Sequence, residues 1–146
     1  MLEPALCLTQ IEGRSQKRIF ETVSEKITAE HPSLDYAEVF DAFSSRERLG
    51  STGLGHGVAI PHCRIEQEGG SIAAAVTLDQ PIEFDAPDQK PVDILVFLMV
   101  CGDASQTHLD TLATLSRLLS EESNRRKLRE AENDDALHNI LVTAAG

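Results

Sequence analysis

Five histidines are present, and His62 differs from the other four in what precedes it along the chain. Pro61 restricts the backbone that leads into His62, and residues 50–57 include four glycines. An imidazole is a base and a nucleophile near neutral pH. Closely spaced glycines expose backbone N–H groups that can surround an anion. This pattern fits chemistry on an anion at His62. The alternative for His62 is a structural or merely exposed histidine, and the alternative for the glycine segment is a flexible turn that binds no ligand.

His108 is the second histidine whose position suggests chemistry. It falls in the first turn of a helix expected to begin at Ser105, beside the positive end of the helix dipole. An imidazole there can donate a hydrogen bond to an anion held at His62. The alternative for His108 is a capping or surface role.

The spacing of the histidines and cysteines argues against two other kinds of chemistry, metal binding and thiol catalysis. His56 and His62 are not an i, i+4 pair, and no acidic residue lies between them as in HExxH. Cys63 follows His62 directly, and neighbours on a strand point to opposite faces, which argues against a Cys–His nucleophile pair. The sequence therefore predicts no metal site and no cofactor.

Two nucleotide-binding motifs can be compared with the glycine-rich segment. A P-loop requires Gly-Lys-Ser/Thr after its spacer, whereas Gly55 is followed by His56 and Gly57. A dinucleotide fingerprint lies between a strand and a helix, whereas this segment follows an expected helix and enters an expected strand. Neither motif is present, so the backbone N–H groups of Gly53, Gly55 and Gly57 are the candidate phosphate-binding groups.

The elements that position these residues can be predicted from the spacing of apolar side chains. Residues 15–30 and 33–46 have helical spacing, with Ser15 and Ser33 as N-caps, so two helices are expected to come first. The glycines then form a loop, and residues 58–62 form a short or edge strand that ends at His62. A reactive side chain at such a strand end is accessible to solvent.

The second half of the chain contains the expected centre of the sheet. Residues 71–78 form a strand, and Pro81 separates it from a half-buried strand at 82–84. Residues 92–100 are almost continuously apolar and rich in β-formers, which predicts a central strand covered on both faces. Three helices follow, beginning near Ser105, Arg125 and Asn133.

Length, composition and element order agree on one globular domain over residues 1–146. The chain is 41% hydrophobic and 25% charged, as expected for a packed core of ordinary size. Because helices and strands interleave without repeats, we expect an α/β fold: a single-domain α/β/α sandwich with a mixed central sheet and helices on both faces.

The charge distribution excludes some partners. The net charge is −11 and no basic run exceeds residues 125–127, so nucleic acid is not expected to bind.

The N-terminus lacks a signal-peptide pattern, and the longest apolar run, residues 94–101, is too short to span a bilayer. We expect a cytoplasmic protein that is not membrane-embedded. Its three scattered cysteines are expected to be reduced thiols.

Residues 47–63, ERLGSTGLGHGVAIPHC, resemble the active-site signature of the IIA proteins of the bacterial phosphotransferase system (PTS), fructose–mannitol type, the type-2 EIIA family. An acidic residue, an aliphatic-Gly pair and an A-I-P-H ending occur in the family's order. The resemblance continues through PIEFDAPDQKPVDILVFLMV (residues 81–100) and THLDTLATLSRLL (residues 107–119), so it covers nearly the whole chain.

This resemblance implies that His62 is phosphorylated by the phosphohistidine of a small HPr-like carrier. The chain would then be a phosphotransferase component with a phosphohistidine intermediate. It further implies that Nε2 of His62 attacks, that His108 stabilises the phosphoryl group, and that Arg46 pairs with the phosphoryl oxygens or orients the loop. The other nitrogen of His62 should be held as N–H by a backbone carbonyl or a similar acceptor.

The run FDAPDQKPVDILVF (residues 84–97) is most similar to the nitrogen-regulatory IIA proteins. This similarity implies a nitrogen-branch HPr as donor and a regulatory output on targets such as a potassium transporter subunit or a sensor kinase. The alternative within the family is a sugar-specific IIA that passes phosphate to a IIB component in fructose or mannitol uptake. An alternative from another class is a non-catalytic protein-binding module.

Overall fold

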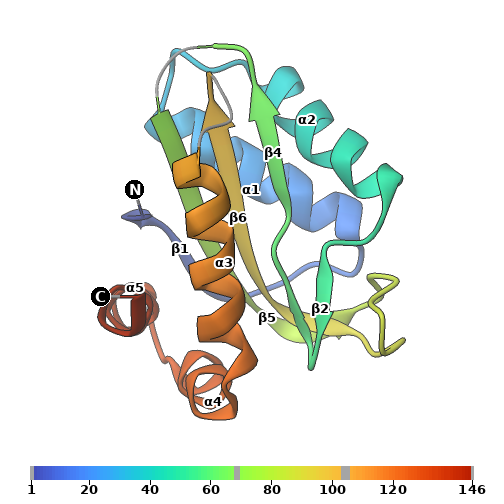
Figure 1. Ribbon diagram of the computed structural model, residues 1–146, viewed down its shortest axis with the longest axis vertical. Helices are drawn as coiled ribbons and strands as arrows, with labels where there is room; N and C mark the ends of the chain where they lie inside the picture. The colour runs from blue at the N-terminus through green and yellow to red at the C-terminus, as the bar shows by residue number, and fades with distance from the viewer. Residues whose placement is uncertain (1, 68–69, 103–105, 146) are drawn as a thin grey trace.

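A mixed six-stranded sheet lies between two layers of helices in the computed structural model, which describes residues 2–67, 70–102 and 106–145 (Figure 1). The strands are β1 (Leu2–Ile11), β2 (Gly53–Gly55), β3 (Val58–Ala59), β4 (His62–Ile65), β5 (Gly70–Ile82) and β6 (Val92–Cys101). The helices are α1 (Gln16–Glu30), α2 (Tyr36–Leu49), α3 (Gln106–Ser120), α4 (Glu122–Glu130) and α5 (Asp134–Ala145).

The strand order is β1-β5-β6-β3-β2, and β4 pairs with β6 beyond the end of β3. Strand β1 is parallel to β5, and both β3 and β4 are parallel to β6. The pairs β5–β6 and β2–β3 are antiparallel. The expected mixed sheet with helices on both faces is therefore confirmed, and no helix of the described ranges is long and apolar enough to cross a membrane.

Strand β6 is the centre of the sheet, as its apolar sequence predicts. Its side chains alternate between two cores, because successive strand residues point to opposite faces. Leu95, Phe97 and Met99 belong to the core under α1 and α2. Ile94 and Val96 belong to the core under α3, α4 and α5.

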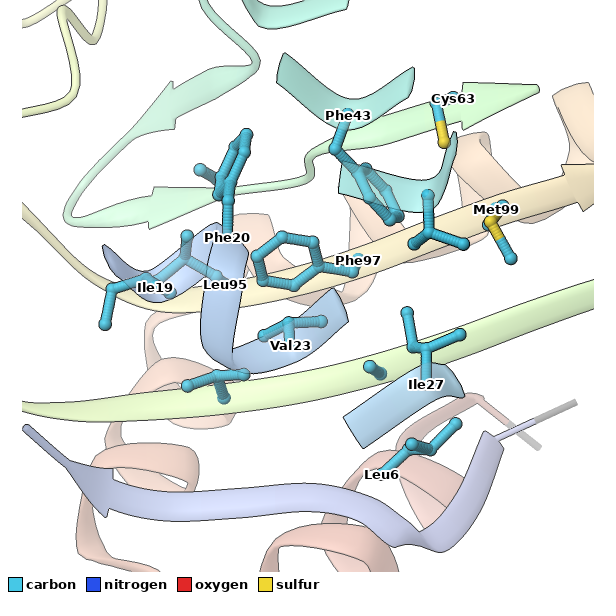
Figure 2. Close-up of a cluster of buried hydrophobic side chains, with 14 of the residues drawn as sticks. Leu6, Ile19, Phe20, Val23, Ile27, Phe43, Cys63, Leu95, Phe97 and Met99 are labelled. Carbon is cyan, nitrogen blue, oxygen red and sulfur yellow. The ribbon is translucent and has the colours of Figure 1, made fainter. Parts of the chain in front are cut away.

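Aromatic rings fill the first of these cores (Figure 2). Phe97 contacts Phe20 and Phe43 edge-on, with ring centroids 5.3 Å apart in both pairs. Such T-shaped contacts place a ring edge against a ring face and add to the stabilisation from burial. They attach α1 and α2 to the centre of the sheet, and α2 leads directly into the segment that carries His62.

Several sequence expectations about the elements need correction. The glycine segment is not all loop, because Gly53–Gly55 form β2, and the helix expected to begin near Arg125 begins at Glu122. A strand, β1, precedes the two helices that were expected to come first. The N-cap of α2 is Asp35, whose carboxylate accepts from the Glu38 amide at 3.1 Å, and not Ser33. Strand β5 continues through Pro81, where its pairing with β6 is irregular, because proline lacks the N–H of a ladder but tolerates extended backbone.

Other expectations about helix ends are confirmed. Ser15 caps α1 by accepting from the Arg18 amide at 3.1 Å. Asn133 caps α5, and its side-chain oxygen accepts from the Ala136 amide at 2.8 Å. The expected cap of α3, Ser105, lies outside the described residues.

Candidate functional site

His62 is the first residue of β4 and not the last residue of the preceding strand. Strand β3 ends at Ala59, and the chain resumes pairing with β6 when His62 comes opposite Leu98. Pro61 separates the two strands because it has no N–H to donate to a ladder. Its carbonyl still accepts from the Leu98 amide at 2.9 Å, which keeps the segment against β6. His62 is half-buried at this position.

The side chain of His62 faces the α3 side of the sheet. Its neighbour Cys63 is buried in the opposite core, under α1 and α2, while Ile60 belongs to the α3 side. Because strand residues alternate, His62 is on the same face as Ile60. Burial raises the pKa of the Cys63 thiol to about 12, so this thiol stays protonated near neutral pH. Cys63 and His62 therefore do not form a nucleophile pair.

One ring nitrogen of His62 is held by the backbone. Nδ1 lies 2.8 Å from the carbonyl oxygen of Ile60, and a carbonyl only accepts, so Nδ1 carries the proton in this contact. In the neutral imidazole the lone pair is then on Nε2. The sequence expectation of a carbonyl partner for His62 matches this geometry. The arrangement orients the ring and places the lone pair of its neutral form on Nε2.

The loop after α2 is tied to the segment that precedes His62. The Glu47 carboxylate accepts from the amide and the hydroxyl of Thr52, at 2.8 and 2.6 Å. The carbonyl of Thr52 accepts from the Ile60 amide at 3.1 Å, and Arg46 donates to the carbonyl of Gly50 at 2.9 Å. A chain of hydrogen bonds therefore runs from the end of α2 to Ile60, whose carbonyl holds His62. Arg46 is positioned as a partner of this loop.

The other residues expected at the site are placed as follows. His108 lies in the first turn of α3, and its side chain lies outside the described residues. Gly53 is in β2, and its amide donates to the Ser51 hydroxyl at 3.1 Å. A Cβ at Gly53 would lie 2.8 Å from the Cβ of Ala86, so the glycine permits close packing of β2 on the following loop. The contacts of Gly53 are thus structural ones.

Gly55 and Gly57 are not brought close to His62. They flank His56 in the turn between β2 and β3, and all three residues have positive φ. Gly57 is next to Val58, which pairs with Ile94, whereas His62 pairs with Leu98. Four residues of β6 separate the two levels, or about 13 Å at roughly 3.3 Å per residue. The turn is therefore at one end of β3 and His62 beyond the other.

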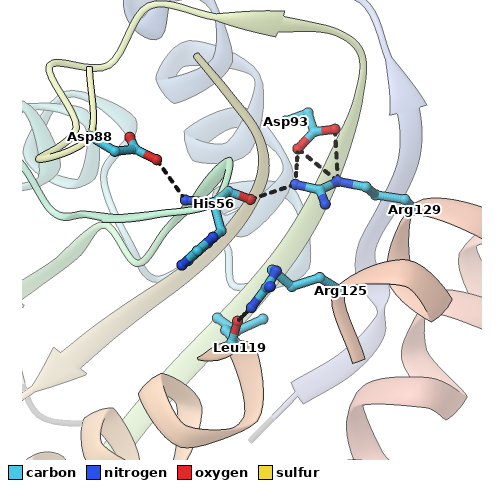
Figure 3. Close-up of polar contacts among 6 residues, drawn as sticks. All are labelled: His56, Asp88, Asp93, Leu119, Arg125 and Arg129. Atoms are coloured by element: carbon cyan, nitrogen blue, oxygen red, sulfur yellow. Dashed lines mark hydrogen bonds and ion pairs between the residues drawn. The ribbon is translucent and has the colours of Figure 1, made fainter. Parts of the chain in front are cut away.

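The turn is held by side chains that the sequence did not single out (Figure 3). Asp88 accepts from the His56 amide at 2.9 Å, and the hydrogen bonds from the backbone amides of His56 and Lys90 lower the pKa of its carboxyl. Arg129 of α4 donates to the His56 carbonyl at 2.7 Å and to the Asp93 carboxylate at 2.9 Å. Asp93 is the one charged residue in the apolar strand β6, and this was the sequence feature that could have indicated a polar contact there.

In the described ranges, no three His, Cys, Asp or Glu side chains are grouped as metal ligands would be. Cys7, Cys63 and Cys101 are buried free thiols there.

Comparison with known proteins identifies the family. The family model described as "Phosphoenolpyruvate-dependent sugar phosphotransferase system, EIIA 2" matches residues 1–143. The chain belongs to this EIIA type-2 family. The nitrogen regulatory protein of Pseudomonas aeruginosa is 39% identical over 142 residues, which cover 97% of this chain and 92% of that protein. Among EIIA relatives, the fructose-specific EIIA component of Haloferax volcanii is 35% identical over 108 residues, covering 74% of this chain and 70% of that protein.

A solved relative has the same fold. The nitrogen regulatory protein IIA-Ntr of Neisseria meningitidis superposes with a TM-score of 0.90 at 37% identity, over 96% of this chain and 95% of that one. The resemblance inferred from residues 47–63 is therefore confirmed at the level of the EIIA family and its α/β fold.

Proposed function

We propose that Nε2 of His62 accepts a phosphoryl group from the phosphohistidine of an HPr-like carrier. The observation that most supports this proposal is the 2.8 Å contact between Nδ1 of His62 and the Ile60 carbonyl, which leaves the lone pair on Nε2. The lone pair forms the new N–P bond while the N–P bond of the donor breaks, and that electron pair returns to the donor imidazole. The group moves between two nitrogens, so no oxidation or reduction is required.

The surrounding residues act by positioning and by stabilising charge. Phosphoryl transfer has a loose transition state, so catalysis depends on alignment and on donors aimed at the equatorial oxygens. In this proposal His108, in the first turn of α3, donates to the phosphoryl group. Arg46 and Glu47 fix the loop that holds Ile60, through their bonds to Gly50 and Thr52. Gly53, Gly55 and Gly57 shape the hairpin and are given no contact with the phosphate.

We propose further that the output is regulatory. The Pseudomonas aeruginosa and Neisseria meningitidis relatives are named nitrogen regulatory proteins, and their identity to this chain extends over nearly its whole length. Phosphorylation of His62 would add about −1.5 to −2 charges to one surface, which is enough to change the partners that this surface binds. The donor is then a nitrogen-branch HPr in the cytoplasm, and the targets are proteins such as a potassium transporter subunit or a sensor kinase.

A second candidate is a sugar-specific role. The similarity to a protein named as a fructose-specific EIIA component favours it. In that role His62 passes its phosphoryl group to the cysteine of a separate IIB component, which then phosphorylates the sugar during uptake. The chemistry at His62 is the same in both candidates, and only the acceptor differs.

Intact-mass spectrometry tests the phosphoryl transfer. Incubation with phosphoenolpyruvate, enzyme I and the carrier should add about 80 Da to the chain as an acid-labile group, as expected for one phosphoryl group. His62→Ala should abolish the adduct, whereas His31→Gln, which removes an imidazole bound to Glu3 at 2.8 Å, should retain it. A wild-type chain without the adduct would indicate a non-catalytic binding module. An adduct on His62→Ala would assign the acceptor to another residue.

A second experiment separates the two outputs. The phosphorylated chain is mixed with a fructose-type IIB protein, and loss of the adduct is followed together with sugar phosphate formation. The regulatory proposal expects the adduct to persist on the chain. Rapid transfer to the IIB cysteine, with formation of sugar phosphate, would establish the sugar-specific role instead.

A further inference from the structure

A cleft of about 600 Å³ lies between the β2–β3 turn, the loop before β6, and α4 (Figure 3). We call it the hairpin cleft, and its charged and titratable lining is His56, Lys90, Asp93, Glu122, Arg125 and Arg129. It is on the level of Gly57 and Ile94, about four residues of β6 or roughly 13 Å from the level of His62. The hairpin cleft is thus separate from the site at His62.

Arg125 is the unusual member of this lining, because it is a charged side chain only 8% exposed. Its Nη1 donates to the carbonyls of Leu119 and Ser120, at 3.0 and 2.7 Å, where α3 ends. In the described part of the chain no carboxylate pairs with its guanidinium. A buried cation without an anion is unfavourable, and the two carbonyls compensate it only in part.

The remaining donors of Arg125 open onto the cleft. Nε and Nη2 have no hydrogen-bond partner among the described residues. Ser24 Oγ is the one fully enclosed polar side-chain atom without a partner in those ranges, so the Arg125 nitrogens are not sealed inside the protein. Arg125 therefore presents N–H groups to a space that a ligand can enter.

The charge of Arg129 is offset by a neighbouring carboxylate, unlike that of Arg125. Arg129 is paired with Asp93 at 2.9 Å and also donates to the His56 carbonyl, so its side chain is held in place at one side of the cleft. Only a glycine at position 57 leaves room for this side chain, because a Cβ there would lie 2.5 Å from Arg129 Nη2. The turn is held on α4 by these contacts, and the imidazole of His56 is directed to the same side as Arg125 (Figure 3).

Lys90 and His56 complete the polar lining of the cleft, and Lys90 adds a second basic side chain to Arg125 in a chain of net charge −11. In the described ranges no hydrogen bond or ion pair engages the Lys90 ammonium or the His56 ring. With Asp93 paired to Arg129, the acidic residue left in the lining is Glu122, whose Oε1 is paired with Arg126 at 3.4 Å. Arg125 therefore lines the cleft without a paired carboxylate among the described residues, and Lys90 interacts with the Asp88 carboxylate through space but forms no ion pair there.

We propose that the hairpin cleft binds a phosphorylated, hydroxyl-bearing small molecule. Arg125 and Lys90 line the same cleft, and a guanidinium and an ammonium are donors that proteins use for phosphate. Oε2 of Glu122, the carboxylate oxygen that Arg126 does not contact, can accept hydrogen bonds from hydroxyl groups of the same ligand. A volume of about 600 Å³ is in the range of small-molecule sites. A capping role of Arg125 at the end of α3 explains only its Nη1 contacts and leaves Lys90 and His56 without a function.

The test is an NMR titration of the ¹⁵N-labelled His62→Ala protein, so that no phosphate effect can come from His62. The probes are ribose 5-phosphate, ribose and inorganic phosphate. We expect ribose 5-phosphate to cause saturable shifts at the amides of His56, Gly57 and Lys90. Inorganic phosphate should shift the same amide signals with a weaker affinity, and ribose should leave these signals unchanged.

Two charge-matched variants decide whether the cleft is responsible. Lys90→Gln should weaken ribose 5-phosphate binding about tenfold, as expected for the loss of one charge-assisted hydrogen bond. Lys127→Gln removes the same charge from an exposed position of α4 outside the lining and should leave the affinity unchanged. Arg125→Lys keeps the charge but not the planar fork, and should also weaken binding.

The proposal is overturned if no amide of the cleft shifts with ribose 5-phosphate at about 10 mM, a limit that corresponds to very weak binding. Equal affinities of the Lys90→Gln and Lys127→Gln proteins would reduce the effect to general charge and would also overturn it. Equal binding of ribose 5-phosphate and inorganic phosphate would refute the part of the proposal that concerns hydroxyl groups. These outcomes are independent of phosphoryl transfer to His62, because that residue is absent from the protein tested.

Discussion

Replacing Gly57 with alanine tests how the β2–β3 turn is joined to α4. The φ angle of Gly57 is +81°, where an L-residue is strained by about 1–2 kcal/mol. The new Cβ would also lie 2.5 Å from Arg129 Nη2 and 3.0 Å from Asp93 Oδ1. Nη2 is at the end of a flexible side chain, so Arg129 can move away, but it then loses its bonds to the His56 carbonyl and to Asp93.

The size of this second effect follows from exposure. The side chains of Arg129 and Asp93 are 38% and 23% exposed, so solvent screens the pair and we assign its loss about 1 kcal/mol. Gly55→Ala is the matched control, because its φ is +90° and its new Cβ would make only an ordinary contact, 3.5 Å from Asp88. Gly57→Ala should therefore lower the free energy of unfolding by roughly 2–3 kcal/mol, about 1 kcal/mol more than Gly55→Ala.

Urea denaturation of both variants measures this difference, in the wild-type and in the Arg129→Ala background. In the Arg129→Ala background the extra loss of Gly57→Ala should disappear, because the contact that it disrupts is already absent. The reasoning is refuted if the two glycine variants are equally stable in the wild-type background. It is also refuted if the difference between them persists without the Arg129 side chain.

Three further changes have defined outcomes. Phe97→Ala removes a fully buried ring that contacts Phe20 and should cost about 3–5 kcal/mol of unfolding free energy in urea denaturation. Asn133→Ala removes the cap bond to the Ala136 amide and should cost about 1 kcal/mol, seen as a lower urea midpoint with an unchanged m value. Burial raises the pKa of Cys63 from 9.0 to about 12, so the folded state holds a proton that the unfolded state releases first. Stability should therefore fall as pH rises above about 9, and less steeply in Cys63→Ala, as urea midpoints at successive pH values would show.

The elements that could be predicted from the sequence are those whose signal is local. The apolar run of β6 indicated a strand covered on both faces, and side chains from both cores cover it. Ser15 and Asn133 were recognisable as caps because a cap acts on amides within three residues of itself.

The elements that were missed depend on partners distant in the sequence. Strand β1 pairs with β5, with Leu2 opposite Ala73, and nothing within β1 shows this pairing. Pro81 suggested a break between two strands, yet β5 continues through it because the missing N–H coincides with an irregular register opposite β6. Tertiary pairing outweighed local propensity in both places.

The same division holds for the site. The order of residues from Glu47 to Cys63 by itself identified the EIIA family and selected His62, since these residue types at this spacing form a local signature. Only the tertiary structure decided which groups surround that histidine. The register of β3 and β4 against β6 puts the glycine turn at Arg129 and Asp93, and puts His62 beyond Ile60, whose carbonyl lies against Nδ1. Four residues along a strand span about 13 Å, so residues that are close in the sequence can lie at opposite ends of a strand.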